Sequence, residues 1–216
     1  MQTDLINNTI AFVKSELAGA EGGHDWFHIE RVCKNALLIA QNETCDRLVV
    51  QLGALLHDIA DSKFHDGDES VGPERAQRFL ELENVNQQTI GHVIDIIENI
   101  SFKGGNFEKK FSSKELDIVQ DADRLDAIGA IGIARTFNYG GFKNRPLYDP
   151  EIAPNLNMSM QEYKASDAPT LNHFYEKLLL LKDKMNTETG KQIAMKRHQY
   201  MEDFLSQFYA EWEGKR

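Results

Sequence analysis

The sequence predicts an all-α protein, a compact bundle of about eight helices. Apolar residues recur at intervals of three and four through almost the whole chain, which is the spacing of one helix face. No segment alternates polar and apolar residues for long enough to predict a strand. Four of the five prolines lie between residues 146 and 169, where the helical spacing disappears. Each predicted helix therefore rests on an apolar stripe and on the residues at its ends.

The first part of the chain contains three predicted helices. One apolar stripe ends at Gly19 and predicts a helix over about 3–18. Asp25 can cap a second helix, whose apolar residues follow the i, i+3, i+4, i+7 series closely. Asp46 can cap a third, in which the segment LVVQLGALLHDIA is apolar on nearly all sides. Because such a helix must be buried against several neighbours, we expect it at the centre of the bundle.

The remaining helices follow from similar signals. Pro73 at a first-turn position predicts the start of a fourth helix, and apolar stripes predict two more over 89–100 and 114–137. The region 138–169 is predicted to be a long loop. Two further stripes predict a closing helical hairpin over about 167–214.

Length and composition indicate one globular domain over residues 1–216. The chain carries 24 Lys+Arg against 34 Asp+Glu, and this net charge of −10 argues against a protein that binds a nucleic acid polymer along its backbone. No charged leader precedes an apolar run, and no stretch of about 18 apolar residues is present. We therefore expect a cytoplasmic protein that neither spans nor binds a membrane. Cys33 and Cys45 lack metal-binding spacing and are expected to be reduced thiols.

Four polar residues stand on otherwise apolar helices: His28, His57, Asp58 and Asp123. Burial of an imidazole or a carboxylate costs several kcal/mol unless the group is paired, and metal coordination satisfies two His and two Asp together. This mixed nitrogen and oxygen set suits a divalent ion such as Mn, Fe, Co, Ni or Zn, and Mg with more difficulty. Such an ion converts a bound water into a hydroxide nucleophile and neutralises charge on a phosphoryl oxygen. The natural chemistry is hydrolysis of a phosphate ester or anhydride.

Three segments, in this order, resemble the blocks of the HD-domain superfamily of metal-dependent phosphohydrolases: HDWFHIERV (24–32), LLHDIAD (55–61) and DADRLDA (121–127). The resemblance covers about 20–140, the expected metal-site core. Among the branches of the family, the sequence looks most like the small bacterial single-domain proteins, some of which are nucleotide pyrophosphohydrolases.

The resemblance implies that His28, His57, Asp58 and Asp123 bind one divalent ion, with Mn²⁺ the first choice. Asp123 is preferred to the neighbouring Asp121 because the last block of the family reads Ala-Asp-x-Leu, as residues 122–125 do here.

The family often places an acidic residue three positions after the Asp of the His-Asp doublet, and Asp61 fills that place. The resemblance therefore implies that Asp61 transfers a proton or orients water, from the same helical face as Asp58. Some branches hold a second ion with extra histidines after the doublet, where this chain has His65 and His92. A single ion is favoured here, because the clustered His pair of those branches is missing.

Cations are needed to bind the phosphates of a substrate. The nearest in sequence are Arg31, one turn after His28, and Lys63, just past the His-Asp doublet. Lys143 and Arg145 lie in a Gly-containing segment that could fold over a bound nucleotide.

Nucleoside triphosphate pyrophosphohydrolysis is the first functional hypothesis, because of the branch resembled. A 5'-nucleotidase or a phosphodiesterase of the same fold is the alternative within the family. A regulatory module that holds a nucleotide without turnover is the alternative from another class. The oligomeric state stays open, with a homodimer among the options.

Asp126, Gly129 and Gly132 lie in or just after the last block, and each allows two interpretations. Asp126 could accept a hydrogen bond from a ligand histidine, or it could form a salt bridge. Gly129 and Gly132 are interpreted as close-packing positions between helices, because no strand precedes them as a phosphate-binding loop would require.

Overall fold

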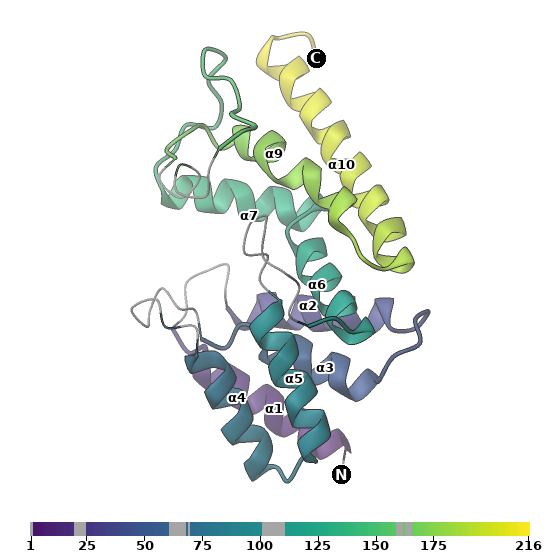
Figure 1. The fold of residues 1–216 in the computed structure, drawn as a ribbon. Helices are drawn as coiled ribbons and strands as arrows, with labels where there is room; N and C mark the ends of the chain where they lie inside the picture. The colour runs from purple at the N-terminus through teal and green to yellow at the C-terminus, as the bar shows by residue number, and fades with distance from the viewer. Residues whose placement is uncertain are drawn as a thin grey trace. The chain divides into compact units, whose positions relative to one another are not determined.

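The computed structural model describes residues 2–19, 25–60, 68, 70–100, 111–158, 162 and 166–216. These residues form nine α-helices and one 3₁₀-helix without any strand, which confirms the all-α class (Figure 1). The chain divides into two compact units, Met1–Asp123 and Arg124–Arg216. The expectation of a single all-helical domain over residues 1–216 stays a prediction.

The first unit is built from helices α1 to α6, and α6 continues for three residues into the second. The bounds are α1 Gln2–Glu16, α2 Trp26–Ile39, α3 Arg47–Leu56, α4 Val71–Leu82, α5 Gln87–Asn99 and α6 Lys114–Asp126. Helix α3 packs against α1, α2 and α5, and seven of its ten residues are buried. The prediction that this apolar helix lies centrally is confirmed within the first unit.

Side-chain caps explain where two of these helices begin. Asp25 accepts a hydrogen bond from the backbone N–H of His28 at the start of α2, and Asp46 accepts two at the start of α3. Both caps agree with the prediction, since a short polar side chain satisfies amides that have no partner inside the helix. Pro73 was expected in the first turn of α4, and it is the third residue of that helix, which begins at Val71.

The prediction of one helix over 114–137 was wrong, because the structure breaks it into α6 and α7 (Gly129–Phe142). Ile128 is extended and Gly129 has a φ of +75°, a conformation that side chains other than glycine rarely adopt. A Cβ on Gly132 would lie 2.2 Å from the carbonyl oxygen of Ala127. The close contact of Gly132 is therefore with the backbone of this turn, and the expected packing between two helices is not what requires glycine there.

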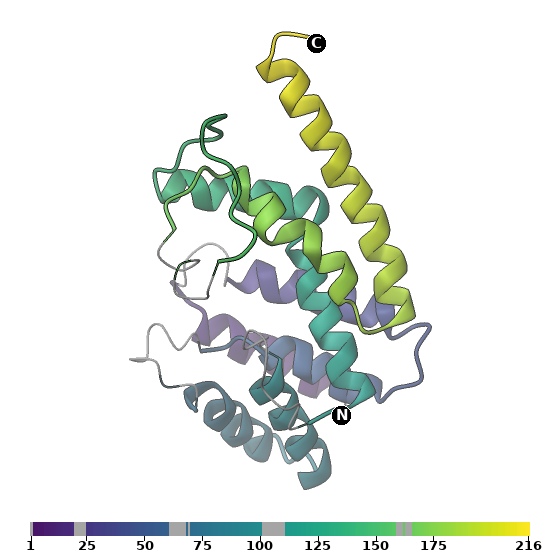
Figure 2. The ribbon, with the colours of Figure 1, turned by 45° about the horizontal axis from the view of Figure 1, so that its top comes forward.

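The second unit contains α7, α9 (Asn172–Glu176), the 3₁₀-helix η2 (Leu178–Lys184) and α10 (Glu188–Trp212). Figure 2 shows η2 turning into α10 so that the two run side by side in opposite directions, as expected for the closing hairpin. The first arm of this hairpin is split into α9 and η2, and α7 reaches into the region predicted as a loop. Within the described residues, no helix combines the length and apolar character needed to cross a bilayer.

Candidate metal centre

Helices α2 and α3 bring three of the four predicted ligands together. His28 lies in the first turn of α2 and is 3% exposed, while His57 is the buried residue that ends α3 and Asp58 follows in the next turn. One ligand atom from each of these residues can be chosen so that all three atoms lie within 4.8 Å of one another. The imidazole rings meet edge to face, with ring centroids 5.5 Å apart. The first two sequence blocks therefore converge at one end of α3.

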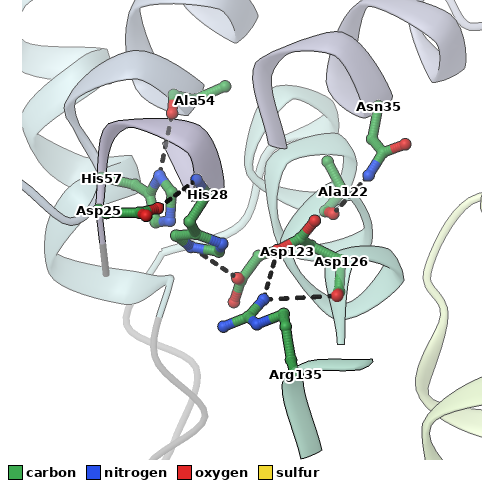
Figure 3. Close-up of polar contacts among 9 residues, drawn as sticks. All are labelled: Asp25, His28, Asn35, Ala54, His57, Ala122, Asp123, Asp126 and Arg135. Atoms are coloured by element: carbon green, nitrogen blue, oxygen red, sulfur yellow. Dashed lines mark hydrogen bonds and ion pairs between the residues drawn. The ribbon is translucent and has the colours of Figure 1, made fainter. Parts of the chain in front are cut away.

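The tautomer of His57 follows from its hydrogen bond. Its Nδ1 lies 2.9 Å from the carbonyl oxygen of Ala54, which can only accept, so Nδ1 carries the proton (Figure 3). The other ring nitrogen, Nε2, then presents a lone pair. A backbone carbonyl that fixes the ring in this way is the usual partner of a metal-binding histidine.

Asp123 comes to the same place from α6. Its Oδ1 lies 3.6 Å from Nε2 of His28, which is too long for a hydrogen bond (Figure 3). Two atoms that bind one ion at about 2.1 Å lie roughly 3.0–4.2 Å apart. The Asp123 side chain is 43% exposed whereas that of His28 is 4% exposed. One side of the group is thus open to solvent.

The donor set fits a divalent ion. Two imidazoles and two carboxylates supply borderline and hard ligand atoms. Atoms of His28, His57 and Asp58 lie within 4.8 Å of one another, and Asp123 lies 3.6 Å from His28. Asp121, the alternative on α6, is fully buried, whereas Asp123 faces His28. The geometry is consistent with the choice of Asp123, although the ligand assignment itself stays a prediction.

Two predicted site residues, Asp61 and Lys63, lie outside the described residues, as does His65. Helix α3 ends at Leu56, and Asp58 lies beyond it. Proton transfer by Asp61 stays a prediction that rests on the family pattern.

The predicted phosphate-binding cations are placed as follows. Arg31 is half-buried, one turn after His28 on α2. Lys143 is exposed at the end of α7, with its Nζ 5.2 Å from the ring centroid of Phe142. The guanidinium of Arg145 lies over the Tyr139 ring and donates a hydrogen bond to the carbonyl oxygen of Ser166. A substrate role for Arg31, Lys143 and Arg145 stays a prediction.

The structure shows the salt bridge that was one of the two interpretations of Asp126. Its carboxylate forms an ion pair with Arg135 of α7, and Asp126 is 1% exposed (Figure 3). Sequence analysis did not identify Arg135, because the pair spans the break between α6 and α7 and no helical spacing connects the two residues. The salt bridge is confirmed.

His92 is engaged away from the candidate centre. Its Nε2 lies 2.9 Å from Oγ of Ser113 and 3.5 Å from Oε2 of Glu115. In the part of the chain that the structure describes, the group able to hold an ion contains His28, His57 and Asp58, and His92 is not a member. Cys33 is a free, buried thiol, and burial raises its pKa to about 11.

Comparison with known proteins agrees with this fold. The HD domain family matches residues 26–128. An HD-superfamily hydrolase from Bacillus thuringiensis is 45% identical and superposes with a TM-score of 0.80, over 99% of each chain. YpgQ, an uncharacterized protein of Bacillus subtilis, is 37% identical over 204 residues, which cover 94% of this chain and 91% of that protein. The structure of YpgQ in complex with ADP has a TM-score of 0.75 at 33% identity, over 97% of this chain and 96% of that one. The chain therefore belongs to the HD-domain superfamily.

Proposed function

We propose that this protein is a metal-dependent phosphohydrolase that acts on a nucleotide or a similar small phosphate compound, by nucleoside triphosphate pyrophosphohydrolysis. The observation that carries the proposal is the convergence of His28, His57 and Asp58 within 4.8 Å, with Asp123 3.6 Å from His28. Two imidazoles and two carboxylates grouped in this way supply the nitrogen and oxygen atoms that a divalent first-row ion binds.

The proposed ligands are both histidines and both aspartates, and Mn²⁺ is the first choice, with Mg, Co, Ni, Fe or Zn as alternatives. A divalent ion bound there would polarise a phosphoryl oxygen and lower the pKa of a water. The protein fixes the geometry in advance. The carbonyl of Ala54 holds the His57 ring, and the Asp25 cap holds the backbone of His28.

Access for a substrate comes from the exposed side of the group. The half-exposed carboxylate of Asp123 lies at this side, whereas His28 lies behind it in the core. We propose Arg31, Lys63, Lys143 and Arg145 as phosphate-binding residues.

The nucleotide class is supported by a relative. YpgQ, which is similar to this chain over nearly its full length, has been crystallised with ADP. ADP consists of a base, a sugar and two phosphates. We propose that this chain binds ligands of the same kind.

The test is metal analysis followed by a product screen on the same samples. Gently purified wild type and His57→Ala are compared for divalent metal content, and then for release of phosphate and pyrophosphate from nucleotides. We expect about one ion per chain in the wild type. The variant should lose both the ion and the activity. Pyrophosphate as the product identifies pyrophosphohydrolysis, and phosphate from monophosphates identifies a 5'-nucleotidase.

His92→Gln is the matched control, because it removes a histidine of the same unit that lies outside the candidate centre and can still contact Ser113. It should keep the ion. A wild type that holds the ion but hydrolyses no nucleotide, monoester or diester would make the protein a binding module. A wild type that binds no ion even after metal addition would refute the ligand set.

A further inference from the structure

The end of α6 is held by side chains from three other helices. Helix α6 ends at Asp126, so the carbonyl groups of residues 123–126 have no i+4 partner within the helix, and those of Arg124 and Leu125 accept from the backbone N–H groups of Ala127 and Ile128 in the turn that follows. Asn35 of α2 donates to the carbonyl oxygen of Ala122 over 3.4 Å, and Arg197 of α10 donates to that of Leu125. Arg135 of α7 donates to the carbonyl oxygen of Asp126 over 3.4 Å (Figure 3).

Arg135 also binds the side chain at this position. Its guanidinium forms an ion pair with Oδ2 of Asp126, a carboxylate that is almost completely buried. A buried carboxylate is costly without a partner, and here the partner also donates to the backbone of the same residue. One guanidinium therefore fixes both the last residue of α6 and its side chain.

The candidate ligand Asp123 lies in this last turn. Its side chain is 43% exposed, so surrounding atoms restrict it less than they restrict His28. The position of its carboxylate then depends mainly on where the backbone of the turn is held. Last turns of helices fray unless they are fixed by capping contacts.

We propose that Asp126 and Arg135 are positioning residues, which hold the end of α6 so that Asp123 stays within reach of the ion bound by His28. Arg197 assists them through the carbonyl of Leu125. This inference rests on the proposed metal site. Neither Asp126 nor Arg135 contacts the ion in this role, and their effect is on the affinity of the site.

The test measures Mn²⁺ binding by the full-length, metal-free protein, using the electron paramagnetic resonance signal of the free ion. Arg135→Gln alone would remove an ion-pair partner of a buried carboxylate and would destabilise the fold. The main variant is therefore the double substitution Asp126→Asn with Arg135→Gln, which removes both charges. Arg197→Gln is the second variant. Changes in residues that support metal ligands typically weaken affinity by about 10–100-fold.

Arg124→Gln is the matched control. Arg124 lies next to Asp123, but its guanidinium donates to the carbonyl oxygen of Lys184 over 2.6 Å. The control removes the charge of an arginine at the same helix end. We expect the double variant to bind Mn²⁺ at least tenfold more weakly with an unchanged number of sites, Arg197→Gln to show a smaller loss, and Arg124→Gln to stay within about twofold.

Each outcome has one meaning. Wild-type affinity in the double variant and in Arg197→Gln would overturn the positioning role. A loss of affinity that is matched by a loss of helical circular dichroism at the assay temperature would also overturn it, because the effect would then be on folding. A wild type that binds no Mn²⁺ would refute the proposed function itself, which is a separate result.

Discussion

His28 and Asp123 face each other across 3.6 Å, from Nε2 of the imidazole to Oδ1 of the carboxylate, which is the separation of an ion pair and not of a hydrogen bond. A cation shared by the two groups would attract both the imidazole lone pair and the carboxylate. We predict that Asp123→Asn weakens Mn²⁺ binding at least tenfold, because it removes the charge and keeps the shape. Asp121→Asn, at the fully buried neighbour, should bind Mn²⁺ within about threefold of wild type. Isothermal titration checks both, and the reverse order would assign the ligand to Asp121.

Bound metal should stabilise the folded protein. An ion that binds only the native state adds about 2.7 kcal/mol at a concentration 100 times its dissociation constant. For a chain of 216 residues this corresponds to a rise in Tm of roughly 5–10 °C. Differential scanning calorimetry of the chelator-treated wild type with and without Mn²⁺ measures the rise. His57→Ala should show none, and an equal rise in that variant would point to ion binding elsewhere.

The cap at Asp25 should influence both stability and metal binding. Asp25→Ala removes the acceptor of the His28 N–H bond and should cost about 1 kcal/mol of unfolding free energy. Because that amide belongs to a candidate ligand, Mn²⁺ affinity should fall as well. Asp46→Ala is the control, since it removes an equivalent cap at the far end of α3 from His57. Urea unfolding should show a similar loss in both variants, with the loss of affinity confined to Asp25→Ala.

His173 should make the stability of the protein depend on pH. Burial, with Lys177 and Arg145 nearby, lowers its pKa from 6.5 to about 4. Between these values the unfolded chain binds the proton and the folded chain does not. The stabilising contribution is therefore complete above pH 6.5 and is lost as the pH falls to 4, by about 3 kcal/mol in total.

His173→Gln removes this contribution to the pH dependence of the unfolding free energy. Unfolding free energies at several pH values, compared between wild type and variant, isolate it from the other titrating groups. Parallel curves from pH 7 to pH 4 would show that His173 is protonated equally in both states.

Two glycine substitutions should have opposite effects. Gly132→Ala would place its Cβ against the carbonyl of Ala127, so the backbone must shift, at a cost of about 1–3 kcal/mol. Gly91 lies in the exposed interior of α5 with no atom near its Cβ position, so Gly91→Ala should stabilise by about 0.5–1 kcal/mol. Thermal unfolding measures both, and a neutral Gly132→Ala would show that the turn after α6 adapts.

Local signals in the sequence predicted the elements that depend on local physics. The caps at Asp25 and Asp46 were predicted because a short polar residue before an apolar stripe commonly caps the helix that follows. The break between α6 and α7 was missed because the apolar spacing continues across Ile128, while the positive φ of Gly129 leaves no trace in that spacing. The first arm of the hairpin was predicted as one helix because its leucines fit either helix type.

The candidate centre was predicted from the family pattern. The structure adds hydrogen bonds and ion pairs that a sequence pattern does not encode. The hydrogen bond of His57 to Ala54 and the pair of Asp126 with Arg135 depend on how the chain turns after a helix ends. Contacts of that kind have no fixed spacing, so a single sequence does not reveal them. The contacts of His92 are likewise not predicted by the sequence, because its partners Ser113 and Glu115 follow it by about 20 residues.

Helix α6 belongs to both compact units, since Asp123 closes the first and Arg124 opens the second. Coupling free energies between two equilibria are reciprocal. If the contacts of Arg135 and Asp126 strengthen ion binding, the bound ion stabilises those contacts by the same free energy. Hydrogen exchange of the last backbone amides of α6, measured with and without the ion, would detect this stabilisation. An ion held by residues of the first unit would then slow the opening of the contacts that Arg135 and Arg197 make with the end of the same helix.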